Sequence, residues 1–287
     1  MKKRLIKLAI TIVVIAILTG IGKFVWQSVS NRKTTPPQKK ISKVTSKKER
    51  GEKQEALIEI IKEIFTQESP GTTFSLAVYD LKNKEYFGTN DVDPQHAASV
   101  SKVLTAVYVL DQVEKGNASL SDGMGAYNLE FQLEKMINIS NSVSWELIDE
   151  RFKPEDQNTY AKNIGLEATD LRYGENKMSP KDTASLLKKL ASGELLKESH
   201  RTKLFSYMQK TESENFFSPA FDQADLTYYH KTGKFEGEAH DAAIVKHKKY
   251  PFILVVFSNN NIVLDPNERA PVMVKTATEV LDYFDNL

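Results

Sequence analysis

Strand-like segments lie at both ends of the folded part of this 287-residue chain, and a long helical stretch separates them. Helical periodicity dominates residues 99–210, and shorter helical patterns start near residue 56 and cover 271–284. The strand-like segments are 74–81, 85–88, 226–230, 242–246 and 252–258. This order predicts an α/β (α+β) fold, in which both chain ends build one antiparallel sheet flanked by helices and an all-helical subdomain is inserted.

The first 26 residues combine a basic start with a long apolar run. Residues 1–7 contain Lys and Arg but no acid, and 8–26 are long and apolar enough to cross a bilayer. Positive charge ahead of such a segment places the N-terminus in the cytoplasm. We therefore expect a cytoplasmic tail at 1–7, a single-pass transmembrane signal anchor at 8–26, and an extracytoplasmic remainder. A cleaved signal peptide is the alternative, but KFVW at 23–26 is a poor cleavage site.

Residues 27–53 are rich in Lys, Ser and Thr and nearly lack apolar side chains. Such a segment cannot bury enough apolar surface to offset its ordering entropy, so we expect a basic disordered tether. Its basic run is short and lacks interleaved aromatic residues, which argues against nucleic-acid binding. The folded domain is expected at 54–287, where acidic residues outnumber basic ones. The chain has no cysteine, which excludes disulfides and a cysteine nucleophile.

Three short patterns within this domain point to chemistry. They are, in chain order, Ser99-Val100-Ser101-Lys102, Ser140-Asn141-Ser142 and Lys231-Thr232-Gly233. Ser-x-x-Lys alone is a weak signal, since it also occurs at 30–33 and 185–188. The three patterns in this order match the Ser-x-x-Lys, Ser-Asp-Asn and Lys-Thr-Gly set of penicillin-recognising serine enzymes, with a departure in the middle one.

Ser99 and Lys102 lie three residues apart and therefore share one face of the predicted helix. There the Lys102 amine can reach the Ser99 hydroxyl and remove its proton, which makes a serine an effective nucleophile. Lysine acts as a base only when its pKa falls toward neutrality, and burial beside a second cation such as Lys231 would lower it. The alternative is that Ser99 is only the N-cap of its helix.

Lys231-Thr232-Gly233 follows a strand-like run, so a strand that ends in a glycine turn is one interpretation. In the functional interpretation, Lys231 and Thr232 hold a substrate carboxylate, and Gly233 lets the substrate backbone approach the strand. The backbone N–H groups of Ser99 and Lys234 would then form the oxyanion hole.

From about Thr73 to Leu287 the chain resembles class A β-lactamases and the related penicillin-binding serine D,D-peptidases. The similar segments are the hairpin and nucleophile helix at 74–116, MINISNSVSWELI at 136–148, HKTGKFEGEAHDAAIV at 230–245 and PFILVVFSNN at 251–260. The resemblance implies the following roles: nucleophile for Ser99, base for Lys102, proton relay to the leaving group for Ser140, and carboxylate binding for Lys231 with Thr232.

Three departures from the family pattern bear on function. The middle motif ends in Ser142, where the family has an amide that contacts the substrate side chain, so the grip on substrate there is weaker. The segment between the Lys102 helix and Ser140 is short, which would open the cleft to a polymeric substrate. The Ω-loop within 165–190 is truncated, and Glu175 is the nearest candidate for the family's deacylating glutamate, though not at its spacing. We therefore expect weak β-lactam turnover.

Other polar residues near the third motif are expected to be structural. His230 and His240 are more readily explained as buried histidines than as parts of the cleft. Asp241 resembles a family acid that supports the strand. The five histidines of the chain show no metal-ligand spacing, and neither a metal nor another cofactor is implied.

The sequence thus predicts a serine hydrolase that forms an acyl-enzyme on Ser99 with D-alanyl substrates. These are a peptidoglycan D-Ala-D-Ala stem peptide, a β-lactam that mimics it, or a D-alanylated wall polymer. The expected location is the bacterial cell membrane, with the catalytic domain at the cell surface and no nucleic-acid partner. Two alternatives remain: a D-alanyl esterase acting on a wall polymer, and a non-catalytic module that binds or senses the cell wall.

Overall fold

The computed structural model describes residues 46–172 and 174–287. The predicted tail at 1–7, the predicted anchor at 8–26 and most of the predicted tether lie outside these residues. Within the described part of the chain, no helix is both long and apolar enough to span a membrane.

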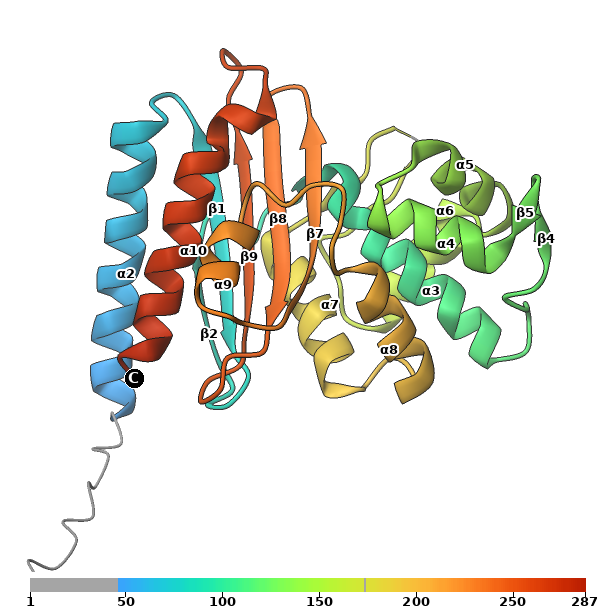
Figure 1. Cartoon of the computed structure of the whole chain (residues 1–287), viewed down its shortest axis with the longest axis horizontal. Coiled ribbons are helices and arrows are strands. Elements are labelled where there is room, and N and C mark those ends of the chain that lie inside the picture. The colour runs from blue at the N-terminus through green and yellow to red at the C-terminus, as the bar shows by residue number, and fades with distance from the viewer. Residues whose placement is uncertain (1–45, 173) are drawn as a thin grey trace, which may run out of the picture. The chain divides into compact units, whose positions relative to one another are not determined.

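The described residues form mixed helix and sheet (Figure 1). The strands are β1 (Thr73–Asp80), β2 (Glu85–Thr89), β3 (Gln95–His96), β4 (Gly123–Met124), β5 (Tyr127–Asn128), β6 (Lys177–Met178), β7 (Tyr228–Phe235), β8 (Glu238–Val245) and β9 (Phe252–Asn259). The α-helices are α2 (Lys47–Glu68), α3 (Lys102–Glu114), α4 (Leu129–Asn138), α5 (Ser142–Arg151), α6 (Pro154–Asn163), α7 (Pro180–Ser192), α8 (Glu198–Tyr207), α9 (Ser218–Gln223) and α10 (Ala270–Asp285). Two 3₁₀ turns are η1 (Ala98–Ser101) and η2 (Pro266–Arg269).

The main sheet has five strands in the order β2-β1-β9-β8-β7, and all neighbours are antiparallel. β1 pairs with β9 from Thr73 opposite Asn259 to Asp80 opposite Phe252, so the two ends of the domain meet inside one sheet. Figure 1 shows α2 and α10 together on one side of the sheet and the green and yellow helices, α3 to α8, on the other. The predicted fold class is therefore confirmed, but the inserted part is not all-helical, because the short strand pairs β3–β6 and β4–β5 lie within it.

Side chains along the central strands point alternately to the two faces of the sheet and contribute to two separate hydrophobic cores. In β9, Ile253 and Val255 belong to the core shared with α3 to α8, whereas Leu254 and Val256 belong to the core shared with α2, α9 and α10. Successive side chains of a strand point to opposite faces, so a strand covered on both faces is apolar throughout. This explains why the β9 sequence reads FILVVF without polar interruption.

Two boundaries differ from the sequence-based prediction. α2 begins at Lys47 rather than near residue 56, so residues 47–53 of the predicted tether are helical. Ser46 accepts from the Glu49 backbone, and the Glu49 side chain accepts from the Ser46 backbone; this capping box starts the helix without an apolar residue. Lys231-Thr232-Gly233 lies inside β7 rather than at its end, because β7 stays paired with β8 as far as Phe235.

Arg50, in the first turns of α2, joins this helix to the hairpin of β1 and β2. Its Nε and Nη2 each donate to one carboxylate oxygen of Glu85 at 2.8 Å, and the two side chains are only 13% and 17% exposed. Paired, partly buried guanidinium–carboxylate contacts of this kind are stronger than single exposed ion pairs.

We expect Arg50→Ala to lower the free energy of unfolding by about 1 kcal/mol, because the bidentate pair is lost. Urea denaturation of a protein comprising residues 46–287 would measure this. Lys48→Ala is the matched control: Lys48 is 87% exposed in its contact with Glu52, and its loss should change stability by less than about 0.5 kcal/mol. Equal effects for the two variants would contradict a structural role for 47–53.

Candidate active site

Ser99 lies in η1, and Lys102 is the first residue of the helix that follows, α3. Ala98, just before Ser99, has a φ of 45°, a left-handed conformation that is uncommon for residues with a side chain. Neither η1 nor α3 begins with a side-chain capping bond. Among the described residues the Ser99 hydroxyl has no hydrogen-bond partner, so the structure gives no support to an N-cap role for it.

Gly233 is the point where the sheet touches η1, the turn that contains Ser99. A Cβ added at Gly233 would lie 2.9 Å from the Ala97 carbonyl oxygen, 3.1 Å from Val100 Cγ2 and 3.2 Å from the Ala98 Cβ. Only a glycine therefore lets β7 pack this closely on η1. The predicted role was access for a substrate backbone; the structure adds a packing role, which the sequence pattern did not reveal.

The amines of Lys102 and Lys231 converge on Ser140. Lys231 Nζ donates to Ser140 Oγ at 3.0 Å, and Lys102 Nζ lies 3.4 Å from the same oxygen and 2.7 Å from the Ser140 carbonyl oxygen. Ser140 itself has a left-handed φ of 57° between α4 and α5. The contact predicted between Lys102 and the Ser99 hydroxyl is not a hydrogen bond here, because the amine is bound to Ser140 instead.

Both lysines are buried, with Lys102 0% and Lys231 2% exposed. Burial lowers the pKa of Lys102 to about 8, although the nearby carboxylate of Asp149 favours its charge. Burial, and then the charge of Lys102, lower the pKa of Lys231 to about 7. A neutral amine is therefore accessible near physiological pH, as a lysine base requires.

The remaining predicted residues border the same place. Ser142 is exposed at the start of α5, and Asn141 before it caps that helix by accepting from the Ser144 backbone. Lys234 follows Gly233 in β7, but its ammonium is bound away from Ser140, between the side-chain oxygens of Asn215 and Asn267 at 2.9 Å each.

A cleft of about 270 Å³ joins these elements. Its walls come from η1, α5, the loop before α7, and the end of β7. The lining residues are His96, Ala98, Ser99, Ser142, Trp145, Glu146, Asp149, Gly174, Asn176, Lys234 and Phe235. Ser99, Ser142 and Lys234 thus share one cavity, while Lys102, Lys231 and Ser140 form the buried cluster described above.

Glu175 does not reach this cleft in the structure. Its side chain is exposed, whereas the next residue, Asn176, lines the cavity and accepts from the Ala97 backbone at 2.8 Å. The short loop is fixed by Asp182, whose Oδ2 accepts from the Ala168 backbone and the Thr169 hydroxyl at 2.8 Å each. Among the described residues, Glu175 is therefore not one of those that line the cleft.

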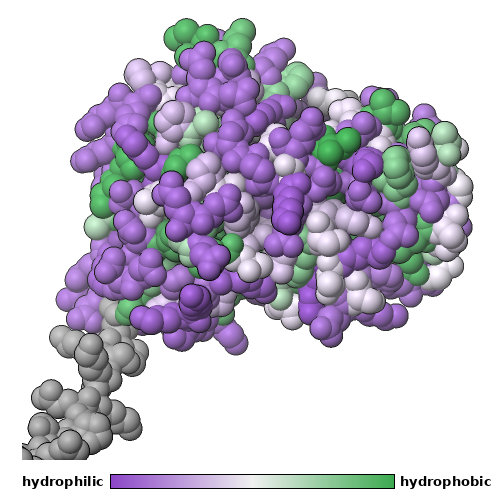
Figure 2. Space-filling view, viewed as in Figure 1, coloured by the Kyte–Doolittle hydropathy of each residue, from purple (hydrophilic) through white to green (hydrophobic). Residues whose placement is uncertain are grey.

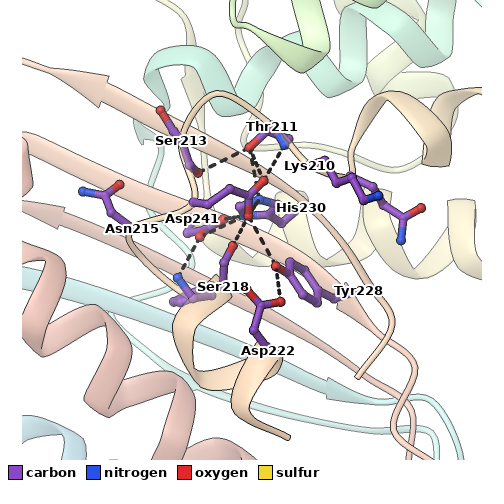
Figure 3. A network of polar contacts seen from close by, with 12 residues as sticks. Lys210, Thr211, Ser213, Asn215, Ser218, Asp222, Tyr228, His230 and Asp241 are labelled. Atoms are coloured by element: carbon purple, nitrogen blue, oxygen red, sulfur yellow. Dashed lines mark hydrogen bonds and ion pairs between the residues drawn. The ribbon is translucent and has the colours of Figure 1, made fainter. Parts of the chain in front are cut away.

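His230, next to Lys231 in β7, is buried between two carboxylates (Figure 3). Its Nδ1 lies 3.0 Å from Asp241 Oδ1, and its Nε2 lies 3.2 Å from Glu214 Oε2. Burial opposes its charge, but Asp241 and Glu214 outweigh burial and raise the pKa of His230 to about 9. Asp241 also accepts from the Phe217 backbone, so this network ties β7 and β8 to the start of α9.

His240 is buried as a neutral ring. Its Nδ1 accepts from the Ser258 backbone at 3.1 Å, which leaves Nε2–H to donate to the His96 carbonyl oxygen at 3.0 Å. Burial lowers its pKa to about 4. In the structure, His230, His240 and Asp241 are therefore held by internal bonds and are not among the residues that line the cleft.

Sequence reasoning missed Asp149 and Trp145. Both line the cleft from α5, and the Lys102 ammonium lies 4.9 Å from the centre of the Trp145 ring. Ser142, Trp145 and Asp149 are separated by three and four residues, which places them on one helix face. This spacing was readable, but only after Ser142 had been placed at the first turn of a helix.

Comparisons with known proteins identify the family and the fold. A family model described as "Beta-lactamase enzyme family" matches residues 56–284. No curated protein matches the chain.

Several solved structures share the fold. The structure of PBP-A has a TM-score of 0.72 and 21% identity, over 82% of this chain and 97% of that one. An ancestral class A β-lactamase has a TM-score of 0.73 and 19% identity, over 79% and 99%. A β-lactamase from Chitinophaga pinensis DSM 2588 has a TM-score of 0.70 and 21% identity, over 79% and 98%. These similarities establish the common fold, and the family model, which spans most of the chain, shows that this protein belongs to the β-lactamase enzyme family.

Proposed function

We propose that the protein is a serine hydrolase that acts on D-alanyl substrates through an acyl-enzyme on Ser99. The observation that carries this proposal is the convergence of two buried lysine amines on the Ser140 hydroxyl, next to a cleft that Ser99 lines. Two amines and a hydroxyl are costly to bury unless they are bonded to one another, and together they can supply the proton transfers that acyl transfer needs.

The proposed acylation assigns one task to each group. Ser99 Oγ attacks the substrate carbonyl carbon while its proton passes to the neutral Lys102 amine. Backbone N–H groups of Ser99 and Lys234 stabilise the oxyanion. The proton then moves through the Ser140 hydroxyl to the departing nitrogen or oxygen. A substrate carboxylate held by Lys231 and Thr232 favours the charged form of Lys231, which leaves Lys102 as the amine that accepts the proton.

Membership of the β-lactamase enzyme family supports this substrate class. A D-Ala-D-Ala stem peptide of peptidoglycan, a β-lactam and a D-alanyl ester of a wall polymer all offer a carbonyl beside a D-alanyl-like group. A variant of PBP-A has been solved as an acyl-enzyme complex with penicillin G, which supports trapping by a β-lactam here. The apolar segment at 8–26 supports placement of the enzyme at the outer face of a bacterial membrane.

When a protein comprising residues 46–287 is mixed with penicillin G, its mass should increase by that of one intact drug molecule. Peptide mapping should locate this adduct on Ser99. The adduct should last minutes to hours, because Glu175 lies outside the cleft. Ser99→Ala should abolish labelling without loss of thermal stability.

Ser185→Ala is the matched control for this labelling. Ser185 also stands in a Ser-x-x-Lys pattern, with Lys188, but it lies within α7 away from the cleft, so labelling should persist. Labelling of the Ser99→Ala variant would refute the assigned nucleophile. Absence of any adduct or drug loss would favour a non-catalytic wall-binding module.

The acylation rate at saturating penicillin should rise with pH between about 6 and 8. Only the neutral Lys102 amine accepts a proton, and its pKa, lowered to about 8 from 10.5, makes that form increasingly abundant over this range. Stopped-flow or quench-flow labelling at several pH values would measure the rise. A rate independent of pH over this range would count against Lys102 as the base.

A further inference from the structure

Asp149 is a carboxylate inside the cleft that the proposed acylation does not use. It lies on the cleft-facing side of α5, seven residues after Ser142, and lines the same cavity as Ser99. Of the described residues that line this cavity, the only other acid is Glu146, whose side chain is exposed. Of the two acids that line the cleft with Ser99, Asp149 is therefore the less exposed.

A chain of buried polar groups fixes the orientation of this carboxylate. Gln157 Nε2 donates to Asp149 Oδ1 at 2.7 Å and to the Phe152 carbonyl oxygen at 2.7 Å. Gln157 Oε1 accepts from the Thr105 hydroxyl at 2.7 Å, and Thr105 also accepts from Trp145 Nε1 at 3.3 Å. Oδ1 is thus occupied, while Oδ2 has no hydrogen-bond partner among the described residues.

This series of hydrogen bonds connects Asp149 to α3, the helix that carries Lys102. Thr105 lies three residues after Lys102 in α3. The helix turn that carries Lys102 therefore also carries the hydroxyl that holds Gln157, the residue bonded to Asp149. Gln157 and Thr105 are both fully buried. A carboxylate that lines the cleft, with Oδ1 bonded to Gln157 and Oδ2 without a partner among the described residues, can accept a hydrogen bond from a water molecule.

The electrostatic setting suits a general base. Burial raises the pKa of Asp149 to about 6, against the bond from Gln157 and the charge of Lys102, which both lower it. The carboxylate is consequently ionised at neutral pH but more basic than an exposed one. Lys102 acts on it through its charge, and Glu146 and Lys234 line the same cleft. The neighbouring cavity that Asp149 also lines contributes further charged residues, which are Glu150, Lys153, Glu155, Asp170 and Arg172.

We propose that Asp149 activates the water that releases the acyl group from Ser99, in place of the glutamate that the truncated loop does not provide. This inference rests on the proposed acyl-enzyme. The water oxygen bonds to the acyl carbon while one water proton passes to the Asp149 carboxylate. The bond from that carbon to Ser99 Oγ then breaks, and the proton reaches Oγ from Asp149 through the neutral Lys102 amine. The products are the free acid and the original serine hydroxyl.

The test is the lifetime of the penicilloyl adduct in Asp149→Asn, followed by mass spectrometry after excess drug is removed. Asparagine retains an oxygen for Gln157 but cannot take up a proton. We expect acylation within about threefold of the unsubstituted protein and an adduct lifetime longer by about 100-fold, the usual contribution of a general base. Glu146→Gln, the other acid of the cleft, should leave the lifetime unchanged.

A second measurement needs no substitution. Deacylation of the unsubstituted protein should speed up as pH rises through about 6 and then level off, because ionisation of Asp149 supplies the base. The same profile should be flat in Asp149→Asn. If the unsubstituted protein destroys penicillin without a lasting adduct, Asp149→Asn should accumulate one.

The outcomes separate this inference from the proposed function. An adduct with equal lifetimes in the unsubstituted protein and Asp149→Asn overturns the role of Asp149 alone. A shifted pH profile of acylation with an unchanged lifetime shows that Asp149 acts only through Lys102, and also overturns it. No adduct and no drug loss in the unsubstituted protein overturns the acyl-enzyme itself.

Discussion

The close approach of β7 to η1 at Gly233 is the contact on which the rest of the site depends. The sheet contributes Lys231 and Lys234, and the helical part contributes Ser99, Lys102 and Ser140. These two halves meet only because no Cβ separates the strand from Ala97 and Val100. Any larger residue at 233 would push the strand back and carry the Lys231 amine away from the Ser140 hydroxyl.

The second constraint is the free-energy cost of burying charged side chains. The protein reduces this cost in different ways on the two sides of β7. Near Ser140, neither Lys102 nor Lys231 is bonded to a carboxylate of the described residues, and burial lowers the pKa of both amines. Away from the cleft, His230 keeps its charge because Asp241 and Glu214 flank it. β7 thus carries the Lys231 amine toward Ser140, whereas the preceding residue, His230, lies in an ion pair with Asp241 on the other side of the strand. Hydrophilic residues dominate the face of the molecule seen in Figure 2, so this buried chemistry is not apparent from that surface.

The fold class could be predicted from the sequence, because long segments of it carry clear patterns. These are the apolar strands 252–258 and 242–246 and the helical periodicity from Ser99 onward. The residues of the three motifs, which lie together in the structure, could be predicted as well. The start of α2 could not be predicted, because a capping box and the Arg50–Glu85 pair stabilise it and its first turns lack apolar periodicity. Nor could Asp149, whose placement depends on Gln157 and Thr105, contacts that no local pattern encodes.

The pairing of β1 with β9 also means that the site is assembled from segments that lie far apart in the chain. Thr73 and Asn259 are neighbours in the sheet, so nearly the whole domain must be synthesised before the sheet closes. Contacts of such long sequence separation form late and slowly. A growing chain already contains Ser99 and Lys102 long before Lys231 exists, and during that time the serine lacks the second amine and the strand that faces it. The cluster around Ser140 therefore cannot assemble until β7, which carries Lys231, has been synthesised.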